Sequence, residues 1–195
     1  MRKYLLYGFA VLLASCRNGD EKAGVPDQVL PAAALVQSAN SDAFNQSFGA
    51  IMTHYYTLSE GFITENDSGI AQSSRNLLQA VDSLRVDELK ADSNIVATAR
   101  SYTVGISAEL KGLLGEEKLE DKRKSFQLVG DQLYDLIRTV HYDRQIIYQF
   151  YCQDAFSDQG GTWLSQSKEV RNPYLPKKKL TCGQLRDSMD FRHLP

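Results

Sequence analysis

The sequence predicts a mainly α-helical protein: an antiparallel up-down four-helix bundle followed by a small, loop-rich C-terminal module with two cysteines. Three observations support this prediction. Between residues 41 and 141, apolar residues recur at three- and four-residue spacing in four successive segments. The connections between these segments are short, which favours antiparallel packing of neighbours. After residue 150, glycines and prolines mark turns, and two of the chain's three cysteines occur there.

Each of the four segments carries an apolar stripe and a start signal. The candidate N-caps are Ser41 or Asp42 for the first helix, Asp67 for the second, and Asp92 or Ser93 for the third, whereas Glu116 and Glu117 favour the start of the fourth. The stripes are Phe44, Phe48, Ile51, Met52, Tyr55, Leu58 and Phe62; Ile70, Ser74, Leu77, Leu78, Val81 and Leu84; Ile95, Ala99, Tyr102, Ile106, Leu110 and Leu113; and Leu119, Phe126, Val129, Leu133, Leu136, Ile137 and Val140.

The charged groups on these helices have no catalytic pattern. Glu60, Glu65 and Asp67 are expected to form a solvated helix end, and residues 122–124 (Lys-Arg-Lys) a solvated helix face. No nucleophile–base pair or metal-hydrolase motif is apparent. An envelope hydrolase is therefore the least favoured of the three functions that we consider for this chain. His141 is the only histidine near Cys152 in sequence, and no oxyanion-type motif accompanies it.

The region after the fourth segment changes character. Residues 145–152 are rich in β-branched and aromatic residues, which indicates a strand, although the helix could also continue into them. Turn residues dominate residues 153–183. We expect Trp163 to pack this module on the bundle, and residues 177–179 (three lysines) to form an exposed loop tip.

The N-terminus has the pattern of an export signal. Arg2 and Lys3 precede an apolar run of about ten residues, which is too short to span a bilayer. The run ends in Leu-Ala-Ser-Cys16, which resembles the lipobox of bacterial lipoproteins. That resemblance implies a signal peptide at residues 1–15 and lipidation of Cys16. Two prolines, an alanine run and scattered polar residues indicate that residues 16–40 comprise the lipidated cysteine and a tether. We therefore expect the protein to be lipid-anchored in the bacterial envelope, facing the periplasm or exposed on the outer membrane.

The net charge and the length of the chain limit the classes of partner and the number of domains that we expect. The full chain has a net charge of −2, and removal of residues 1–15 would take away two bases and no acid, leaving −4. Mild acidity argues against nucleic acid or a polybasic membrane contact as a partner. Residues 41–190 are long enough for one helical domain with a core of its own.

Several stretches between residues 45 and 190 resemble one bacterial family, the domain of unknown function 3347. Residues 55–84 resemble its first helices, and residues 121–128 its later helix. The more specific signature lies in the tail: Cys152, Gly161, Trp163 to Ser165, Glu169 to Tyr174 with Asn172 and Pro173, and Cys182-Gly183. The family occurs in Bacteroidetes envelope proteins and fused to adaptor subunits of heavy-metal efflux pumps, which implies a role in metal handling.

The resemblance also implies a Cu(I) site of thiolates and thioethers, but this chain departs from that pattern. Only Cys152 and Cys182 carry over. Asp154 and Lys179 stand where the family has methionines, and the nearest remaining methionine in the tail is Met189. Because Cu(I) prefers soft sulfur ligands and a lysine cation opposes a metal ion, the copper site is expected to be degenerate.

Three states of the cysteine pair remain open from the sequence. Export favours a disulfide, which would close a loop of about 30 residues. The other two states are metal-binding thiolates and free buried thiols. The sequence therefore supports a lipid-anchored, non-enzymatic envelope protein with two candidate roles. The first is copper handling as an efflux accessory with a degenerate site. The second is a structural or partner-binding lipoprotein in which the disulfide has no metal role.

Overall fold

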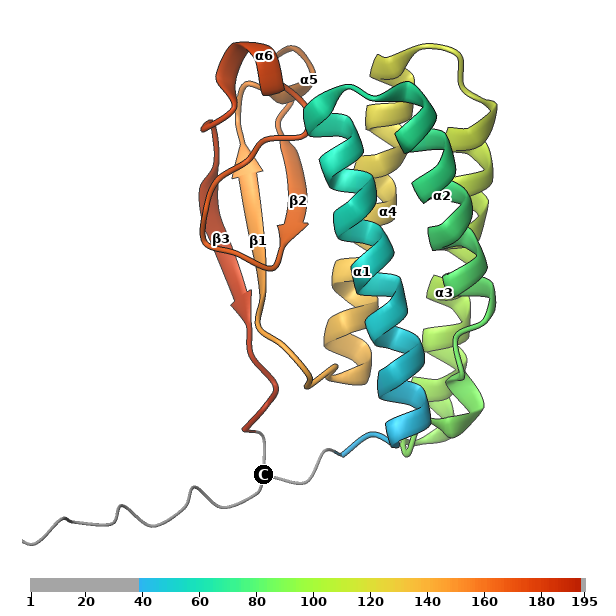
Figure 1. Ribbon diagram of the computed structural model, residues 1–195. Coiled ribbons are helices and arrows are strands. Elements are labelled where there is room, and N and C mark those ends of the chain that lie inside the picture. The colour runs from blue at the N-terminus through green and yellow to red at the C-terminus, as the bar shows by residue number, and fades with distance from the viewer. Residues whose placement is uncertain (1–38, 194–195) are drawn as a thin grey trace, which may run out of the picture. The chain divides into compact units, whose positions relative to one another are not determined.

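The computed structural model describes residues 39–193, and four long helices account for most of them. They are α1 (Asp42–Thr64), α2 (Asp67–Asp82), α3 (Ser93–Gly115) and α4 (Leu119–Val140), with a 3-10 turn, η1 (Val86–Glu88), between α2 and α3. Each helix runs antiparallel to the one before it (Figure 1). The predicted up-down four-helix bundle is therefore confirmed.

The N-terminal predictions lie outside this region. The expected signal peptide, Cys16 and the tether up to residue 38 are not among the described residues. Within residues 39–193, every helix is too short or too polar to cross a lipid bilayer.

Side-chain caps start three of the four helices. Ser41 accepts a hydrogen bond from the backbone N–H of Phe44, and Asp92 accepts one from that of Asn94. At α2 the cap is Asn66, whose side chain accepts from Gly69 N–H, and not Asp67 as predicted. Asp67 instead occupies the first turn, where its negative charge favours the helix N-terminus.

The apolar stripes meet in one continuous core. All seven predicted stripe residues of α1 and six of the seven of α4 are buried, the exception being half-buried Leu119. The third stripe begins later than predicted, because Ile95 is 37% exposed. α2 has 16 residues and α3 has 23, and Ser107, in the middle of α3, donates a hydrogen bond to Asp82, the last residue of α2. The first turns of α3 therefore lie beyond the end of α2.

The C-terminal module contains a three-stranded antiparallel sheet, β2–β1–β3. The strands are β1 (Ile147–Cys152), β2 (Gly161–Ser165) and β3 (Gln184–Met189), and two four-residue helical segments, α5 (Ala155–Asp158) and α6 (Pro176–Lys179), lie in the connections. Of the two interpretations of residues 145–152, the strand is therefore correct. β2 lies in sequence that predicted turns, and β3 lies just after it, where no strand was predicted.

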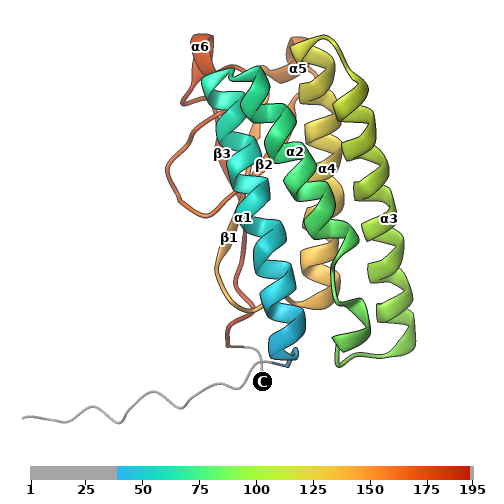
Figure 2. The same ribbon diagram turned by 45° about the vertical axis from the view of Figure 1, so that its right-hand side comes forward.

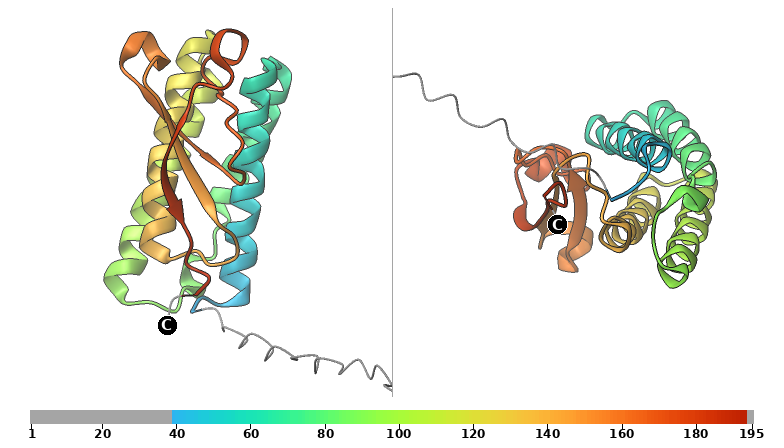
Figure 3. Two further views of the ribbon diagram at one scale, coloured as in Figure 1. Left: turned by 90° about the vertical axis from the view of Figure 1, so that its left-hand side faces the viewer. Right: turned by 90° about the horizontal axis from the view of Figure 1, so that it is seen from below.

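The sheet lies along the side of the bundle formed by α1 and α4, away from α2 and α3 (Figure 3). Side-chain hydrogen bonds join the two layers: Thr162 of β2 donates to Asp131 of α4, and Tyr134 of α4 donates to Asp187 of β3 over 2.8 Å. Figures 1 and 2 show α5 and α6 at the end of the molecule where α1 passes into α2. The end of β1 that carries Cys152 lies there too.

Two buried tyrosine hydroxyls bond the backbone of the edge strand β2. Tyr55 of α1 accepts a hydrogen bond from Leu164 N–H over 3.1 Å, and Tyr174 donates one to the carbonyl oxygen of Thr162. The exposed backbone of an edge strand invites pairing with other chains. Here α1 and the segment around Tyr174 use those groups and fix β2 against the bundle.

Candidate functional site: the cysteine pair and the adjoining cleft

Cys152 and Cys182 form a disulfide in the C-terminal module. Cys152 is the last residue of β1 and is 1% exposed, while Cys182 lies two residues before β3 and is half-buried. Their Cα atoms are 5.5 Å apart, a separation typical of disulfides. Of the three states that the sequence left open, the structure has the disulfide, which closes the segment containing α5, β2 and α6 into a loop.

Asp154 and Lys179, the two departures from the family pattern, meet beside this disulfide. The Lys179 ammonium lies 2.5 Å from Asp154 Oδ2, and the same carboxylate oxygen lies 3.7 Å from Cys182 Sγ. Met189 lies elsewhere, because it pairs with Ile147 at the opposite end of β1. Five residues of strand, on the order of 16 Å, separate that end from Cys152. Met189 is therefore not a partner of the cysteines.

Asn172 organises the segment that leads to Cys182. Its side chain is fully buried, and its amide nitrogen donates to the carbonyl oxygen of Cys182 over 2.9 Å. Its side-chain oxygen accepts from the backbone N–H groups of Tyr174 and Leu175, at 2.7 and 3.1 Å, as in an Asx turn. Both polar ends of the side chain are thus used to hold the backbone around the disulfide.

The aromatic residues of the signature form the interior of the module. The Trp163 ring stacks on Phe150 of β1 at 5.6 Å and meets the Tyr174 ring edge-on at 6.0 Å. Tyr174 in turn lies 6.2 Å from Phe126 of α4. The ring contacts of Trp163 thus lie within the module, and Tyr174 extends this aromatic packing to Phe126 of the bundle core.

Gly183 follows Cys182 where the backbone passes close to this interior. A Cβ atom there would lie 2.7 Å from Trp163 and 2.6 Å from Val170, closer than packed side chains allow. The signature residues Trp163, Asn172, Tyr174 and Gly183 thus have structural roles that depend on one another. Pro173, the remaining member, is buried and accepts a hydrogen bond through its carbonyl oxygen.

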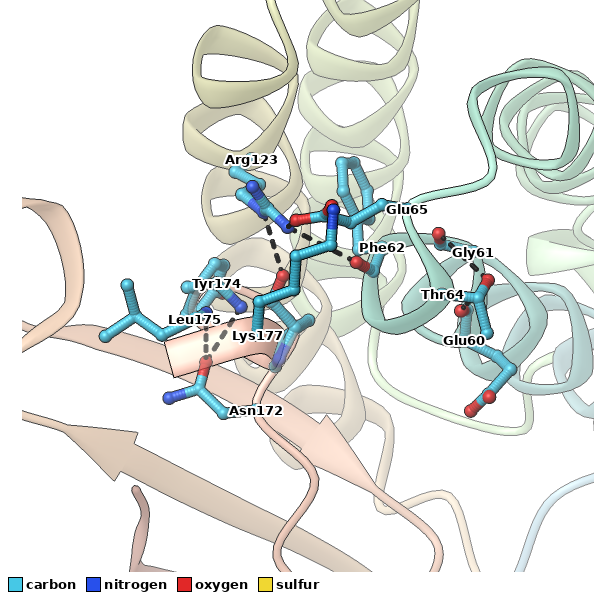
Figure 4. A network of polar contacts seen from close by, with 11 residues as sticks. Glu60, Gly61, Phe62, Thr64, Glu65, Arg123, Asn172, Tyr174, Leu175 and Lys177 are labelled. Carbon is cyan, nitrogen blue, oxygen red and sulfur yellow. Dashed lines mark hydrogen bonds and ion pairs between the residues drawn. The ribbon is translucent and has the colours of Figure 1, made fainter. Parts of the chain in front are cut away.

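The donor to Pro173 is Arg123 of α4, which joins three parts of the fold (Figure 4). Its Nε donates to the Pro173 carbonyl over 2.9 Å, and its Nη2 donates to the Phe62 carbonyl at the end of α1 and to Glu65 over 3.3 and 3.1 Å. The Phe62 carbonyl also accepts a hydrogen bond from the backbone N–H of Glu65, the residue that caps the C-terminal end of α1. Arg123 therefore connects α1, α4 and the module.

The expectation of solvated charges at this end of the bundle was wrong for several residues. The side chains of Lys122, Arg123 and Glu65 are only 10%, 12% and 20% exposed, and Lys122 pairs with Asp67 over 2.5 Å. Arg123 lies four residues after Leu119 and three before Phe126, on the helical spacing of the apolar stripe. That periodicity was the signal that could have marked it as an inward-facing charge.

Salt bridges from the module to α1 strengthen the same junction. Lys177 of α6 pairs with Glu65, so two cations contact that carboxylate, and Arg171 forms a bidentate pair with Glu60 at 2.5 and 2.9 Å. Lys177 first, and then Arg123, lower the pKa of the Glu65 carboxyl below its ordinary value. The lysines of residues 177–179 are exposed as predicted, but α6 is a helical turn with two of them in salt bridges.

A cleft of about 550 Å³ opens between α5, α6 and the helix ends, with Glu65, Arg123, Asp154 and Tyr174 among its lining residues. One wall is unusual, because Phe156, Ser157 and Asp158 have φ angles of 55°, 57° and 66°. Each non-glycine residue in this left-handed region costs about 1–2 kcal/mol, so neighbouring structure must enforce it. Here the disulfide precedes this turn and the pairing of β2 with β1 follows it.

We expect Glu65→Gln to lower the stability of the protein at neutral pH and to reduce its sensitivity to acid. A carboxyl with a lowered folded-state pKa stabilises the protein fully above its unfolded pKa, about 4.3 for Glu. This contribution is lost as the pH falls through the lower folded-state pKa. Chemical denaturation between pH 3 and pH 7 measures the effect.

Glu120→Gln is the matched control, because Glu120 lines the same cleft but is 72% exposed and lies 3.9 Å from its partner Lys124. It should change stability much less. Equal pH profiles for the Glu65 variant and the original protein would show that the Arg123–Glu65–Lys177 contacts do not stabilise the fold.

The residues around the disulfide do not fit the Cu(I) site that the family resemblance implies. Such a site needs soft sulfur donors. The groups next to the sulfurs are a carboxylate and an ammonium, and Met189 lies at the other end of β1. In the oxidised state, moreover, neither cysteine is a thiolate.

Comparison with known proteins gives one result. The model of the family described as "Protein of unknown function (DUF3347)" matches residues 51–145, which run from the middle of α1 to just before β1. No curated protein and no solved structure matches the chain significantly. The resemblance noted in the sequence is thus confirmed for the helical part, while the tail with its cysteines lies outside the matched residues. Residues 51–145, just under half of the chain, therefore match the DUF3347 family of proteins of unknown function.

Proposed function

We propose that this chain is a lipid-anchored, non-enzymatic protein of the bacterial envelope with a structural or partner-binding role, and that its disulfide stabilises the C-terminal module. One observation carries this proposal: Asn172, the central polar residue of the signature, uses both ends of its side chain on the backbone next to Cys182. Residues that serve a ligand direct polar groups into open space. The signature residues of this module bond and pack against one another instead.

Metal handling, as an accessory of a heavy-metal efflux system, is the second candidate. One observation favours it: Cys152 Sγ, Cys182 Sγ and a carboxylate oxygen of Asp154 all lie within 4.8 Å of one another. Reduction of the disulfide would turn this cluster into a set of possible metal ligands. The envelope location and the partnership with efflux proteins rest on the sequence resemblances.

Copper tolerance of cells separates the two candidates if stability is controlled. The test variant replaces Cys152 and Cys182 together by serine, and the control Leu133→Ala destabilises the bundle core by a similar amount without touching the cysteines. We expect both variants to be less abundant and copper tolerance to follow abundance alone. Loss of tolerance in the serine variant, at a protein level equal to that of the control, would establish a metal role and contradict the structural one.

Membrane attachment should depend on Cys16. Lipid on the cysteine that follows the signal peptide would anchor the mature protein, so Cys16→Ala should leave the chain unprocessed or release it from the membrane fraction. Fractionation and immunoblotting measure this, with Cys152→Ala as the control that keeps Cys16. A Cys16→Ala protein of normal mature size that stays with the membrane would contradict the lipid anchor.

A further inference from the structure

We propose that the reduced form of this protein binds a divalent cation of the zinc type through Cys152, Cys182 and Asp154. This inference rests on the second candidate function, metal handling, and specifies the ion and the ligands of that site. Asp154 is the new element, because it stands at a position where the family resemblance suggests a thioether. The site would lie at the end of β1, beside the cleft.

The donor atoms are already close to the spacing that such an ion needs. With Zn–S bonds near 2.3 Å and Zn–O bonds near 2.0–2.2 Å, the ligand atoms of a tetrahedral site lie about 3.4–3.8 Å apart. Asp154 Oδ2 lies 3.7 Å from Cys182 Sγ, and all three donors lie within 4.8 Å of one another. The two sulfurs move apart once their bond is broken, so small side-chain rotations complete a three-ligand site with water as the fourth ligand.

The donor set indicates which ion it suits. Two thiolates and one carboxylate are ligands that Zn²⁺ takes in proteins, and Co²⁺ adopts the same geometry as a spectroscopic substitute. Cu(I) is satisfied by the two sulfurs and gains little from a hard carboxylate oxygen. Asp154 therefore distinguishes the two metals: it should matter for Zn²⁺ and not for Cu(I).

Lys179 is the competitor for Asp154. Its ammonium contacts the carboxylate oxygen that lies nearest to Cys182. The side chains of Lys179 and Asp154 are 54% and 37% exposed, and ion pairs that are open to water hold their partners weakly. A metal ion beside two thiolates can therefore displace the lysine. Removing the lysine should strengthen metal binding.

The chemistry requires a reductant of the dithiol class. The dithiol transfers two electrons and two protons to the Cys152–Cys182 bond, which yields two cysteine thiols and the oxidised, cyclic disulfide of the reductant. Zn²⁺ then replaces the two thiol protons, which pass to the solvent. Cys182 is the half-buried sulfur of the pair and the one open to attack, whereas Cys152 is 1% exposed.

Metal titration of the reduced protein tests the proposal. The whole chain carries Cys16→Ser, so that Cys152 and Cys182 are its only thiols. It is reduced with a phosphine that does not bind zinc and is titrated anaerobically with Zn²⁺, with Co²⁺ and with Cu(I) against competing chelators. We expect one Co²⁺ per chain with a thiolate-to-metal charge-transfer band and the visible bands of a tetrahedral site.

Three further variants locate the ligands. Asp154→Asn should weaken Zn²⁺ binding by at least about tenfold and leave Cu(I) affinity unchanged. Lys179→Gln should tighten Zn²⁺ binding roughly two- to fivefold, and an increase in affinity cannot arise from misfolding. Lys178→Gln is the matched control, because it removes a neighbouring exposed lysine outside the Asp154 pair and should have no effect.

The outcomes that overturn the proposal are equally specific. If the Asp154→Asn variant binds Zn²⁺ as tightly as the parent chain does, Asp154 is not a ligand. If the reduced chain keeps its helical circular dichroism but does not bind Zn²⁺, the proposed site does not exist. If reduction itself unfolds the chain, added Zn²⁺ must restore the fold, and failure to do so also rejects the proposal. Because the protein is reduced deliberately, these results are independent of whether it carries the disulfide in cells.

Discussion

Replacing Cys152 and Cys182 together by serine is expected to lower the free energy of unfolding by about 3–4 kcal/mol. The disulfide joins residues 30 positions apart, and in the chain-entropy treatment a loop of that size restricts the unfolded chain by this amount. The effect should be concentrated in the module, because the disulfide supports the left-handed turn at residues 156–158 and the contacts of Asn172. Chemical denaturation without reductant measures it.

The control for this prediction is the unmodified protein with reductant. It should lose a similar amount of stability, whereas the double-serine variant should not respond to reductant at all. If the free energy of unfolding of the double-serine variant lies within about 0.5 kcal/mol of that of the oxidised protein, the module does not depend on the disulfide.

Leu133→Ala is expected to cost about 2–5 kcal/mol, the range for truncating a large aliphatic side chain in a packed core. Leu133 lies on the buried face of α4 and is 0% exposed. The cost combines the apolar surface returned to water on unfolding with the cavity left in the folded core. Thermal and chemical unfolding monitored by helical circular dichroism measure the change.

Leu128→Ala provides a matched control on the same helix. Leu128 is 46% exposed, so its truncation should change stability by no more than about 0.5 kcal/mol. Similar losses for the two variants would mean that α4 does not bury the face that carries Leu133.

The helices were predictable because their signals are local. An apolar residue every three or four positions reveals which face is buried, and the positions between Phe44 and Phe62 repeat this spacing without interruption. Capping was predictable only to within a residue, as the use of Asn66 in place of Asp67 shows. The exposure of Ile95 could not be predicted, because it depends on the length of a neighbouring helix.

Most of the sheet could not be predicted from the sequence, because its strands depend on partners that are distant in the chain. β3 reads Gln-Leu-Arg-Asp-Ser-Met, with no run of β-branched or aromatic residues, and most of it is exposed. It pairs with β1 across more than thirty residues of chain. β2 lies among glycines that indicated a turn. The left-handed residues Phe156 to Asp158 carry no glycine signal, so only the surrounding structure explains them.

The candidate site was partly predictable. The cysteine positions, Trp163 and the residues from Asn172 to Tyr174 were identified as a signature from the sequence, but their mutual contacts were not. The contacts of the charged residues were harder to predict. The sequence marked Asp154 and Lys179 as departures from a family pattern without revealing that they pair with each other. Arg123 was assigned to the solvent because a run of three basic residues usually faces water.

The most direct test of the account is the oxidation state of Cys152 and Cys182 in protein isolated from the cells that produce it. Cells are lysed in acid to prevent thiol exchange, free thiols are alkylated before and after reduction, and peptides are identified by mass spectrometry. The account predicts that both cysteines are protected before reduction and that a peptide pair linked through Cys152 and Cys182 is recovered. Two freely alkylated cysteines in the isolated protein would contradict it.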